Sequence, residues 1–536
     1  MAERTDAGSV FRESAGQPRK ALEFALIFTV FFVVGGAPAP HVNETYYLTK
    51  AKHYWQPDWC AGDPFLESAD AQPVFYWSIG WLASYFSLTT VAWIGRTAAW
   101  LVLAGAWQRL SSRVFPGPWR GVLSAMMFAS LIERTNFAGE WVLGGVEGKC
   151  FAYAFVFWGL AALADQKWRA VWPWMGLASA FHVLVGGWST VAAGLVWVTR
   201  SRGERPTFSS MLPSCILGCA LALPGLVPAI LLTYDVDAQT TAEANTIYVF
   251  DRLPHHLAPL KLPLEELLGK AARYEILLLA FVLLWLVCRR NMVESCPART
   301  SAGKLDRLLC FAGWSVMFSG AALGWQAITW DHPVLAARFL KYYWFRLGDI
   351  AVPLAVCLAV GWLINHLIGR HPRWAAALLL LAVALPSWQL LTTSGARYRD
   401  PCPPADRRTR EVSAWQDACE WARTHTPQES LFLVPRSAQS FNWNAHRPDL
   451  VTWKEVPQDA TALLIWRERL FDVFFHANDA GQQVAFGSLA VQGSARIGEL
   501  AKKYDIDYVV TQAYPPLDLP VAYSNAHYKI YSIPGP

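Results

Sequence analysis

The sequence predicts a mainly α-helical, polytopic membrane protein with a small C-terminal α/β domain. Of its 536 residues, 54% are hydrophobic and only 16% are charged, whereas ordinary soluble domains carry about 25% charged residues. The long apolar runs are concentrated in residues 21–392, and residues 393–536 have the composition of a soluble domain. We therefore expect a cytoplasmic N-terminal tail (1–20), a membrane domain (21–392) and a soluble domain (393–536).

About eleven apolar runs fit, or nearly fit, the helix of about 20 residues that crosses a hydrocarbon core of roughly 30 Å. These runs are 21–39, 90–108, 119–133, 150–165, 171–184, 186–199, 211–233, 274–289, 307–327, 349–368 and 374–392. The first is interpreted as a retained span, because Pro40 would follow a signal-peptide cut after Ala39. The apolar segment 73–88 is expected to lie along the membrane surface or to re-enter the membrane.

Charge separates the loops into two sets. With the N-terminus inside, the cytoplasmic loops are 109–118, 166–170, 200–210, 290–306 and 369–373, and each is basic, as the positive-inside rule requires. The other loops are 40–89, 134–149, 234–273 and 328–348. They carry most of the acids and face the opposite side together with the C-terminal domain. The net charge of +5 follows from the basic loops, and no nucleic-acid partner is expected.

The C-terminal domain alternates between helical and strand patterns. "DACEWARTHTP" is helical, "LFLV" and "LVTW" are typical of short strands, "IGELAKKYDIDYVVTQ" indicates helix, turn and strand, and "HYKIYSIP" indicates a last strand. This alternation predicts an α/β domain. No GxGxxG follows any of these strands, so no nucleotide site is expected there.

The first outward loop (40–89) opens with "PHVNETYYLTKAKHYW", in which Glu44, Tyr47 and Ala51 fall on one helix face. The continuation "DWCAGDPFLESADAQP" adds four acids, among them Asp63. A carboxylate cluster beside a membrane cavity can deprotonate a nucleophile or hold a divalent cation. The structural alternative is that Asn43 caps the helix and Glu44 is a first-turn acid favoured by the helix dipole.

The second outward loop and its flanks read "LIERTNFAGEWVLGGVEGKC" and bring Glu140, Glu147 and Lys149 to the same side as Glu44. "GGVEGK" is one residue short of a phosphate loop, but its glycines allow close backbone approach to a ligand; a loop without function is the alternative. His182 lies in an apolar run, where an ionisable residue suggests function, although a satisfied core histidine is the more common outcome.

The stretch "ARFLKYYWFRLGDIAVPLA" places Arg338, Lys341 and Arg346 on the outward side, against the charge rule. Three cations at a membrane surface can grip a phosphate, to which arginine binds in bidentate fashion. The alternative is that Arg346 pairs with Asp349 across one helix turn.

Taken together, these features resemble the GT-C superfamily of polytopic glycosyltransferases, which use polyprenyl-phosphate-linked sugars on the extracytoplasmic face. The resemblance rests on an acid just after the first span (Glu44 within "NETYYLTKAKHYW"), a long first outward loop, many spans and an outward C-terminal domain. It covers the whole chain in architecture and is loose in motif, since the family more often has Asp, frequently in a pair, where Asn43 and Glu44 stand here. The tail block "PRSAQSFNWNAHRPDLVTWKEVP" looks like that of GT-C-type bacterial membrane proteins.

The resemblance implies an inverting transfer from a polyprenyl-phosphate sugar to an extracytoplasmic acceptor at a bacterial inner membrane. Glu44, or next Asp63 or Glu140, would be the catalytic base. Substrate contacts would come from Tyr47, Glu147, Lys149 and His182, and from Arg338, Lys341 and Arg346 on the leaving phosphate. A divalent cation (Mg²⁺ or Mn²⁺) is compatible with the family but not required, and loop 234–273 would be a mobile cover.

Two other functions stay open at this stage. A secondary transporter would use the same spans, with a site near the midplane and commonly a repeat, and we find no internal repeat. A non-catalytic envelope scaffold would bind partners through its C-terminal domain, where "HRPDLVTWKEVP" suits either an acceptor site or a partner interface.

Overall fold

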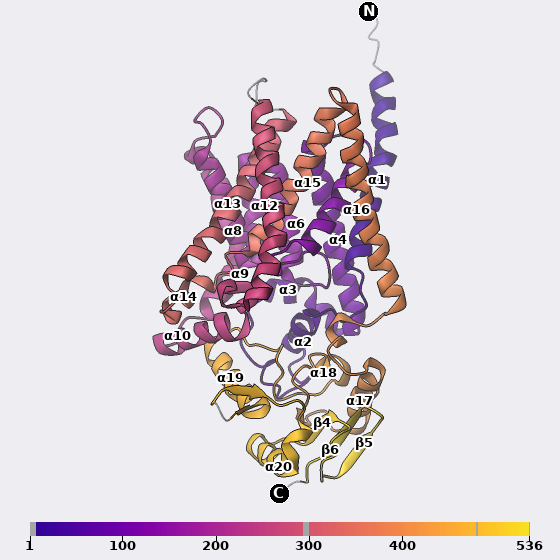
Figure 1. Ribbon diagram of the computed structural model, residues 1–536, viewed down its shortest axis with the longest axis vertical. Helices are drawn as coiled ribbons and strands as arrows, with labels where there is room; N and C mark the ends of the chain where they lie inside the picture. Colours follow the sequence, from indigo (N-terminus) through magenta and orange to yellow (C-terminus); the bar gives the residue numbers. More distant parts are fainter. Residues whose placement is uncertain (1–6, 293–299, 479–480, 535–536) are drawn as a thin grey trace, which may run out of the picture.

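A computed structural model describes residues 7–292, 300–478 and 481–534. A long helical bundle carries, at one end, a smaller domain of helices and strands (Figure 1). The predicted class, mainly helical with a small C-terminal α/β domain, is confirmed.

Each of the predicted spans coincides, over most of its length, with a helix in the described part of the chain. These helices are α1 (Ala7–Gly35), α4 (Leu88–Val114), α5 (Arg120–Arg134), α6 (Gly148–Ala164), α7 (Trp168–Phe181), α8 (Val183–Thr199), α9 (Phe208–Leu231), α12 (Leu264–Met292), α13 (Ser301–Ile328), α15 (Arg346–Ile368) and α16 (Pro372–Arg399). Within the described residues, six of them (α4, α9, α12, α13, α15 and α16) are long and apolar enough to cross a membrane. The number of eleven spans stays a prediction.

Helix α15 is the buried centre of the bundle, and α9 lies at its surface. In α15, 89% of the most apolar window is buried against neighbouring helices, compared with 11% in α9. The exposed face of α9 carries large apolar side chains such as Ile216, Leu223 and Ile230. A helix that is apolar on all sides yet exposed is suited to lipid rather than to water.

The loops predicted to share one side of the membrane do meet at one end of the bundle. They form α2 (Glu44–Trp55), α3 (Pro73–Ser78), η1 (Gly80–Ser84), α10 (Ala238–Thr246), η2 (Ile247–Arg252), α11 (Pro254–Leu257), η3 (Pro259–Lys261) and α14 (Pro333–Leu340). Figure 1 shows α2, α10 and α14 at the end that faces the C-terminal domain. That this end is extracytoplasmic stays a prediction.

The C-terminal domain is built on a four-stranded sheet in the order β1-β4-β6-β5, with β1 and β4 parallel and the other pairs antiparallel. Its elements are η4 (Pro404–Asp406), α17 (Val412–His425), β1 (Phe432–Leu433), α18 (Phe441–Ala445), α19 (Ala460–Phe474), β2 (Phe475–Ala477), β3 (Gln483–Ala485), η5 (Ala490–Gln492), α20 (Gly493–Tyr504), β4 (Tyr508–Gln512), β5 (Val521–Ser524) and β6 (Tyr528–Ser532). The short β2–β3 hairpin stands apart from the sheet.

One strand prediction, "LVTW" (450–453), is wrong. The chain makes a single parallel bridge between Phe432 and Asp449 and then leaves the sheet edge. The Trp453 N–H donates to the Arg436 carbonyl oxygen at 2.9 Å instead of to a strand. Leu450 and Val451 pack in a core cluster with Leu433 and Trp466, and Trp453 lines the cavity described below.

Asp63 fastens the first outward loop to the C-terminal domain. Its Oδ1 accepts the N–H groups of Phe65 and Leu66, both at 3.0 Å, and so shapes its own loop. Its Oδ2 accepts the Asn442 side-chain amide at 2.7 Å and the Asp449 N–H at 3.0 Å. These contacts make Asp63 a buried structural anchor.

Beside this anchor, two buried carboxyl groups, Asp449 and Glu455, lie in contact. Thr452 donates to Glu455 Oε2 at 2.7 Å, but Glu455 Oε1 and both Asp449 oxygens have no donor among the described residues. A shared proton would satisfy both groups. Burial, together with the nearby Asp63, raises the pKa of Glu455 from 4.5 to about 8.

This pair predicts a stability that falls with rising pH. The folded protein binds the Glu455 proton more tightly than the unfolded chain, so the free energy of unfolding should decrease between pH 4.5 and about 8. Glu455→Gln should flatten this slope, whereas Glu468→Gln, at an exposed position of α19, should not. Thermal unfolding followed by tryptophan fluorescence across that range checks it; equal slopes in all three proteins would contradict it.

Candidate functional site

A cavity of about 870 Å³ lies between the C-terminal domain and the end of the bundle that carries α2, α10 and α14. Its lining residues are His182 and some of the residues in the segments 41–43, 46–47, 139–149, 248–256, 343–346, 404–408, 436–439 and 453–458. The covering segment 248–256 belongs to the loop expected to lie over the substrates. All four outward loops and the C-terminal domain therefore contribute to one site.

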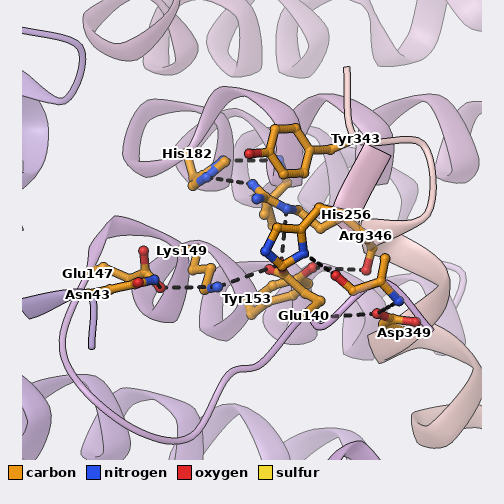
Figure 2. A network of polar contacts seen from close by, with 12 residues as sticks. Asn43, Glu140, Glu147, Lys149, Tyr153, His182, His256, Tyr343, Arg346 and Asp349 are labelled. Carbon is orange, nitrogen blue, oxygen red and sulfur yellow. Dashed lines mark hydrogen bonds and ion pairs between the residues drawn. The ribbon is translucent and has the colours of Figure 1, made fainter. Parts of the chain in front are cut away.

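On the bundle wall of this cavity, two carboxylate side chains alternate with two positively charged side chains (Figure 2). Lys149 Nζ lies 3.0 Å from Glu147 Oε1 and 3.6 Å from Glu140 Oε2. Arg346 Nε lies 3.0 Å from the same Glu140 oxygen, and Arg346 Nη1 donates to His182 Nε2 at 2.8 Å. All five side chains line the cavity, so the predicted outward cluster forms in space.

Asp349 positions Glu140 from behind. Its carboxylate accepts the N–H groups of Phe137, Ala138 and Glu140 at 2.8, 2.9 and 3.1 Å, which fixes the loop between α5 and α6 on the start of α15. The suggested pair of Arg346 with Asp349 is therefore not what the structure contains. Arg346, one helix turn earlier, turns to Glu140 instead.

One oxygen of Glu140 is left for a ligand. Glu140 is only 4% exposed, and its Oε1 has no hydrogen-bond partner among the described side chains and backbone. Buried carboxylate oxygens are nearly always paired, and unpaired ones are typical of sites that bind or react. Glu140 lines the cavity, and its Oε1 is a buried acceptor that no described donor satisfies.

Glu44, the first candidate for the base, has a different environment. Arg96 Nε donates to Glu44 Oε1 at 2.6 Å and Arg96 Nη2 to Oε2 at 2.5 Å, and both side chains are fully buried. The Val146 and His41 N–H groups donate to the same carboxylate at 2.8 and 2.7 Å. Glu44 does not line the cavity. Its role as base stays a prediction, and its contacts are those of a structural ion pair.

The structure brings together six of the ten predicted site residues. Tyr47, Glu140, Glu147, Lys149, His182 and Arg346 line the cavity. Glu44 and Asp63 are buried behind it, Arg338 is exposed on α14, and Lys341 is half-buried near the Tyr342 ring. Within the described residues, no group of three or more His, Cys, Asp or Glu side chains is placed to hold a metal ion.

Sequence reasoning missed most of the C-terminal wall of the cavity. Its basic residues are Arg252, Arg407, Arg408, Arg436 and Lys454, and Arg252 comes from the covering segment. They lie in four separate parts of the sequence. Arg252 belongs to the predicted cover loop 234–273 and Arg436 and Lys454 to the tail block "PRSAQSFNWNAHRPDLVTWKEVP", but no role was predicted for any of them. A basic "DRRTR" run (406–410), near the start of the C-terminal domain, was the signal available for Arg407 and Arg408.

Burial lowers the pKa of three histidines that line the cavity, which favours their neutral form. Burial, and next the charge of Arg96, lowers the pKa of His41 to about 3. Burial, and next Arg252, lowers the pKa of His255 to about 4. Burial also holds the pKa of His256 well below its usual value. The positive charge of the site therefore comes from lysine and arginine.

Two further cavities adjoin the main one. The first, about 590 Å³, lies among α1, α5 and α16, is lined in part by Val34, Ile132 and Leu143, and shares Glu140 with the main cavity. The second, about 490 Å³, lies in the C-terminal domain and shares Arg408 with it. The site thus opens toward the membrane helices on one side and toward the soluble domain on the other.

Comparisons with known proteins give matches in fold. A family model described as a domain of unknown function (DUF6798) matches residues 413–473. No match is found among curated proteins. The oligosaccharyltransferase of Archaeoglobus fulgidus, crystallised with a tethered acceptor peptide, is 11% identical with a TM-score of 0.49, covering 92% of this chain and 69% of that one.

Two other solved structures are similar over most of this chain. ArnT from Cupriavidus metallidurans, bound to undecaprenyl phosphate, is 16% identical with a TM-score of 0.45, covering 96% of this chain and 97% of that one. The arabinofuranosyltransferase AftD from Mycobacteria is 12% identical with a TM-score of 0.46, covering 96% and 40%. These proteins are of the GT-C type. With every TM-score below 0.5, the matches carry no argument about the chemistry of this chain.

The ion pair of Glu44 with Arg96 predicts a defect in stability when one partner is removed. Glu44→Met alone should destabilise the protein by about 3–5 kcal/mol, because the Arg96 charge stays buried without a partner. The double variant Glu44→Gln/Arg96→Met removes both charges, keeps an acceptor for the Val146 N–H, and should recover much of the loss. Thermal unfolding in detergent measures both. A single Glu44 variant that is as stable as wild type would contradict the structural role.

Proposed function

We propose that the protein is a membrane glycosyltransferase that moves a sugar from a polyprenyl-phosphate carrier to an acceptor bound in the cavity. The observation that carries the proposal is the free, buried Glu140 Oε1 beside Lys149 and Arg346 on one cavity wall. A base next to two cations is what displacement of a phosphate leaving group by a hydroxyl or amine requires.

In the proposed reaction, Glu140 Oε1 takes the proton of the acceptor hydroxyl or amine. The acceptor atom forms a bond to the anomeric carbon while the bond from that carbon to the phosphate oxygen breaks, which inverts the anomeric centre. The bonding electrons leave with the lipid phosphate, and Lys149 and Arg346 stabilise the developing negative charge. These steps use only side chains of this protein, and a divalent cation stays a prediction.

Each remaining residue of this wall has a supporting task in the proposal. Glu147 holds Lys149 at 3.0 Å, and Asn43 donates to Glu147 Oε1 at 3.1 Å, so the amine keeps one position. His182 accepts from Arg346 at 2.8 Å and keeps the guanidinium directed along the wall. Tyr47 supplies an aromatic face on the cavity floor, a surface that suits a sugar ring.

The route of the carrier is proposed from the shape of the site. The cavity among α1, α5 and α16 is lined by apolar side chains such as Val34 and Ile132 and by charged ones such as Glu133 and Arg397, and it reaches the main cavity at Glu140. A polyprenyl chain fits apolar surface between membrane helices better than it fits water. The carrier would therefore enter there and present its phosphate to Lys149 and Arg346, with the sugar in the main cavity.

Loss of the base should nearly silence the enzyme. A positioned general base supplies about 10²–10⁴-fold in rate, so Glu140→Gln should lower transfer by at least about a hundredfold while the protein stays folded. The measurement is mass spectrometry of lipid-linked sugars in a deletion strain complemented with each variant. The carrier-linked sugar should accumulate in the deletion and in Glu140→Gln. If Glu140→Gln restores the wild-type profile, a transport or scaffold function is favoured.

Of the two arginines in "ARFLKYYWFRLGDIAVPLA", only Arg346 should be needed for sugar transfer. Arg346→Gln should reduce transfer strongly, because the leaving phosphate loses a charge-assisted contact in the transition state. Arg338→Gln is the matched control, eight positions earlier, exposed on α14 and outside the cavity. The same complementation assay applies. Equal losses in the two variants would contradict the assignment of the phosphate to Arg346.

A further inference from the structure

The C-terminal wall of the cavity holds four cations that have no ion-pair partner in the described part of the protein. Arg252, Arg408, Arg436 and Lys454 line this wall, and none of them forms an ion pair within residues 7–292, 300–478 and 481–534. Their contacts are neutral: Arg252 donates to the Trp453 carbonyl at 3.1 Å, and Lys454 to Asn43 Oδ1 at 2.7 Å. The bundle wall differs, because there Glu140 and Glu147 balance Lys149 and Arg346.

These four cations act on one another electrostatically. Burial, and next the charge of Arg408, lowers the pKa of Arg436. Burial, and next Arg252, lowers the pKa of Lys454 to about 7. Gathering like charges in a partly desolvated site raises the free energy of the empty state. An anion that enters the site removes this cost, so the wall favours a negatively charged ligand.

We propose that Arg252, Arg408, Arg436 and Lys454 form a second anion-binding subsite, which holds a phosphate or diphosphate group of the acceptor. The inference rests on the proposed function, in which the donor phosphate lies at Lys149 and Arg346. Four unbalanced cations exceed what one carboxylate can neutralise, and three are arginines, whose planar forks match phosphate oxygens in bidentate contacts.

Geometry separates this subsite from the donor site. Asn43 stands between them, accepting from Lys454 on one side and donating to Glu147 on the other. The smaller cavity that adjoins Arg408 and Ser437 continues into the C-terminal domain, away from the membrane helices. It has about 490 Å³ for the body of an acceptor. Donor and acceptor thus approach Glu140 from opposite ends.

The test uses Lys454 as a reporter in the full chain, purified in detergent, with inorganic pyrophosphate as the probe. An amine with a pKa of about 7 is about half unprotonated at neutral pH, so it acylates faster than an ordinary lysine while still carrying charge. Bound pyrophosphate raises that pKa and covers the amine, so acylation of Lys454, read by peptide mass spectrometry, should slow at least about tenfold. The exposed Lys502 is the internal control and should not change.

Variants at the two walls distinguish two sites from one. Arg408→Gln and Arg436→Gln, each at an exposed side chain, should weaken pyrophosphate protection of Lys454 by about tenfold each and leave binding of undecaprenyl phosphate unchanged. Arg346→Gln should do the reverse. A short-chain phosphatidic acid is tested in parallel. Stronger protection of Lys454 by this lipid than by pyrophosphate indicates a lipid acceptor, and equal protection indicates that the phosphate group alone is recognised.

The protection assay tests the second anion subsite, and the transfer assay tests the proposed transferase function. Protection of Lys454 that persists in Arg408→Gln and Arg436→Gln overturns the subsite, even if Glu140→Gln is inactive and the transferase stands. Protection lost equally in Arg346→Gln also overturns it, because one anion site then serves both walls. Protection that follows the two C-terminal arginines alone supports the subsite whatever the outcome of the transfer assay.

Discussion

The buried ion pair between Glu44 and Arg96 is the interaction on which the end of the bundle beside the C-terminal domain depends. It joins the start of α2 to the middle of α4, and through the Val146 N–H it also holds the glycine-rich loop before α6. Arg96 Nη1 reaches the Ala37 carbonyl at 2.5 Å and fixes the exit of α1. Two charges without water are stable only when every polar atom is satisfied, and here the surrounding backbone supplies those contacts.

The Glu44–Arg96 ion pair fixes α2, and the position of α2 determines part of the cavity. With α2 in place, Asn43 and Tyr47 stand at the cavity, and Asp349 fixes the opposing loop by three backbone hydrogen bonds. Both carboxylate oxygens of Glu44 and of Asp349 accept hydrogen bonds from the fold, whereas Glu140 keeps one oxygen without a described partner. Unlike the other buried carboxyl groups that lack a donor, such as Asp449 and Glu455, Glu140 lines the main cavity beside two cations, which is the pattern of a reactive site.

The sequence predicted the helices well, because a bilayer demands long apolar segments and charge marks their loops. It also predicted Glu140, Glu147, Lys149 and Arg346, since residue type and membrane side were enough to gather them. It could not show that Glu44 is held by Arg96, 52 positions away. A lone arginine inside the apolar run 90–108 was the available sign, because such a charge requires a partner. The C-terminal wall needed the tertiary fold, as its cations come from distant segments and the segment 450–453 does not form the expected strand.

The most direct test of the central claim is an electron cryomicroscopy structure of the full chain in a lipid nanodisc with undecaprenyl phosphate. The account predicts that the phosphate lies within hydrogen-bonding distance of Lys149 and Arg346, with Glu140 beside it and the lipid chain passing among α1, α5 and α16. Lipid phosphate bound outside this cavity, with Lys149 and Arg346 unoccupied, would contradict it.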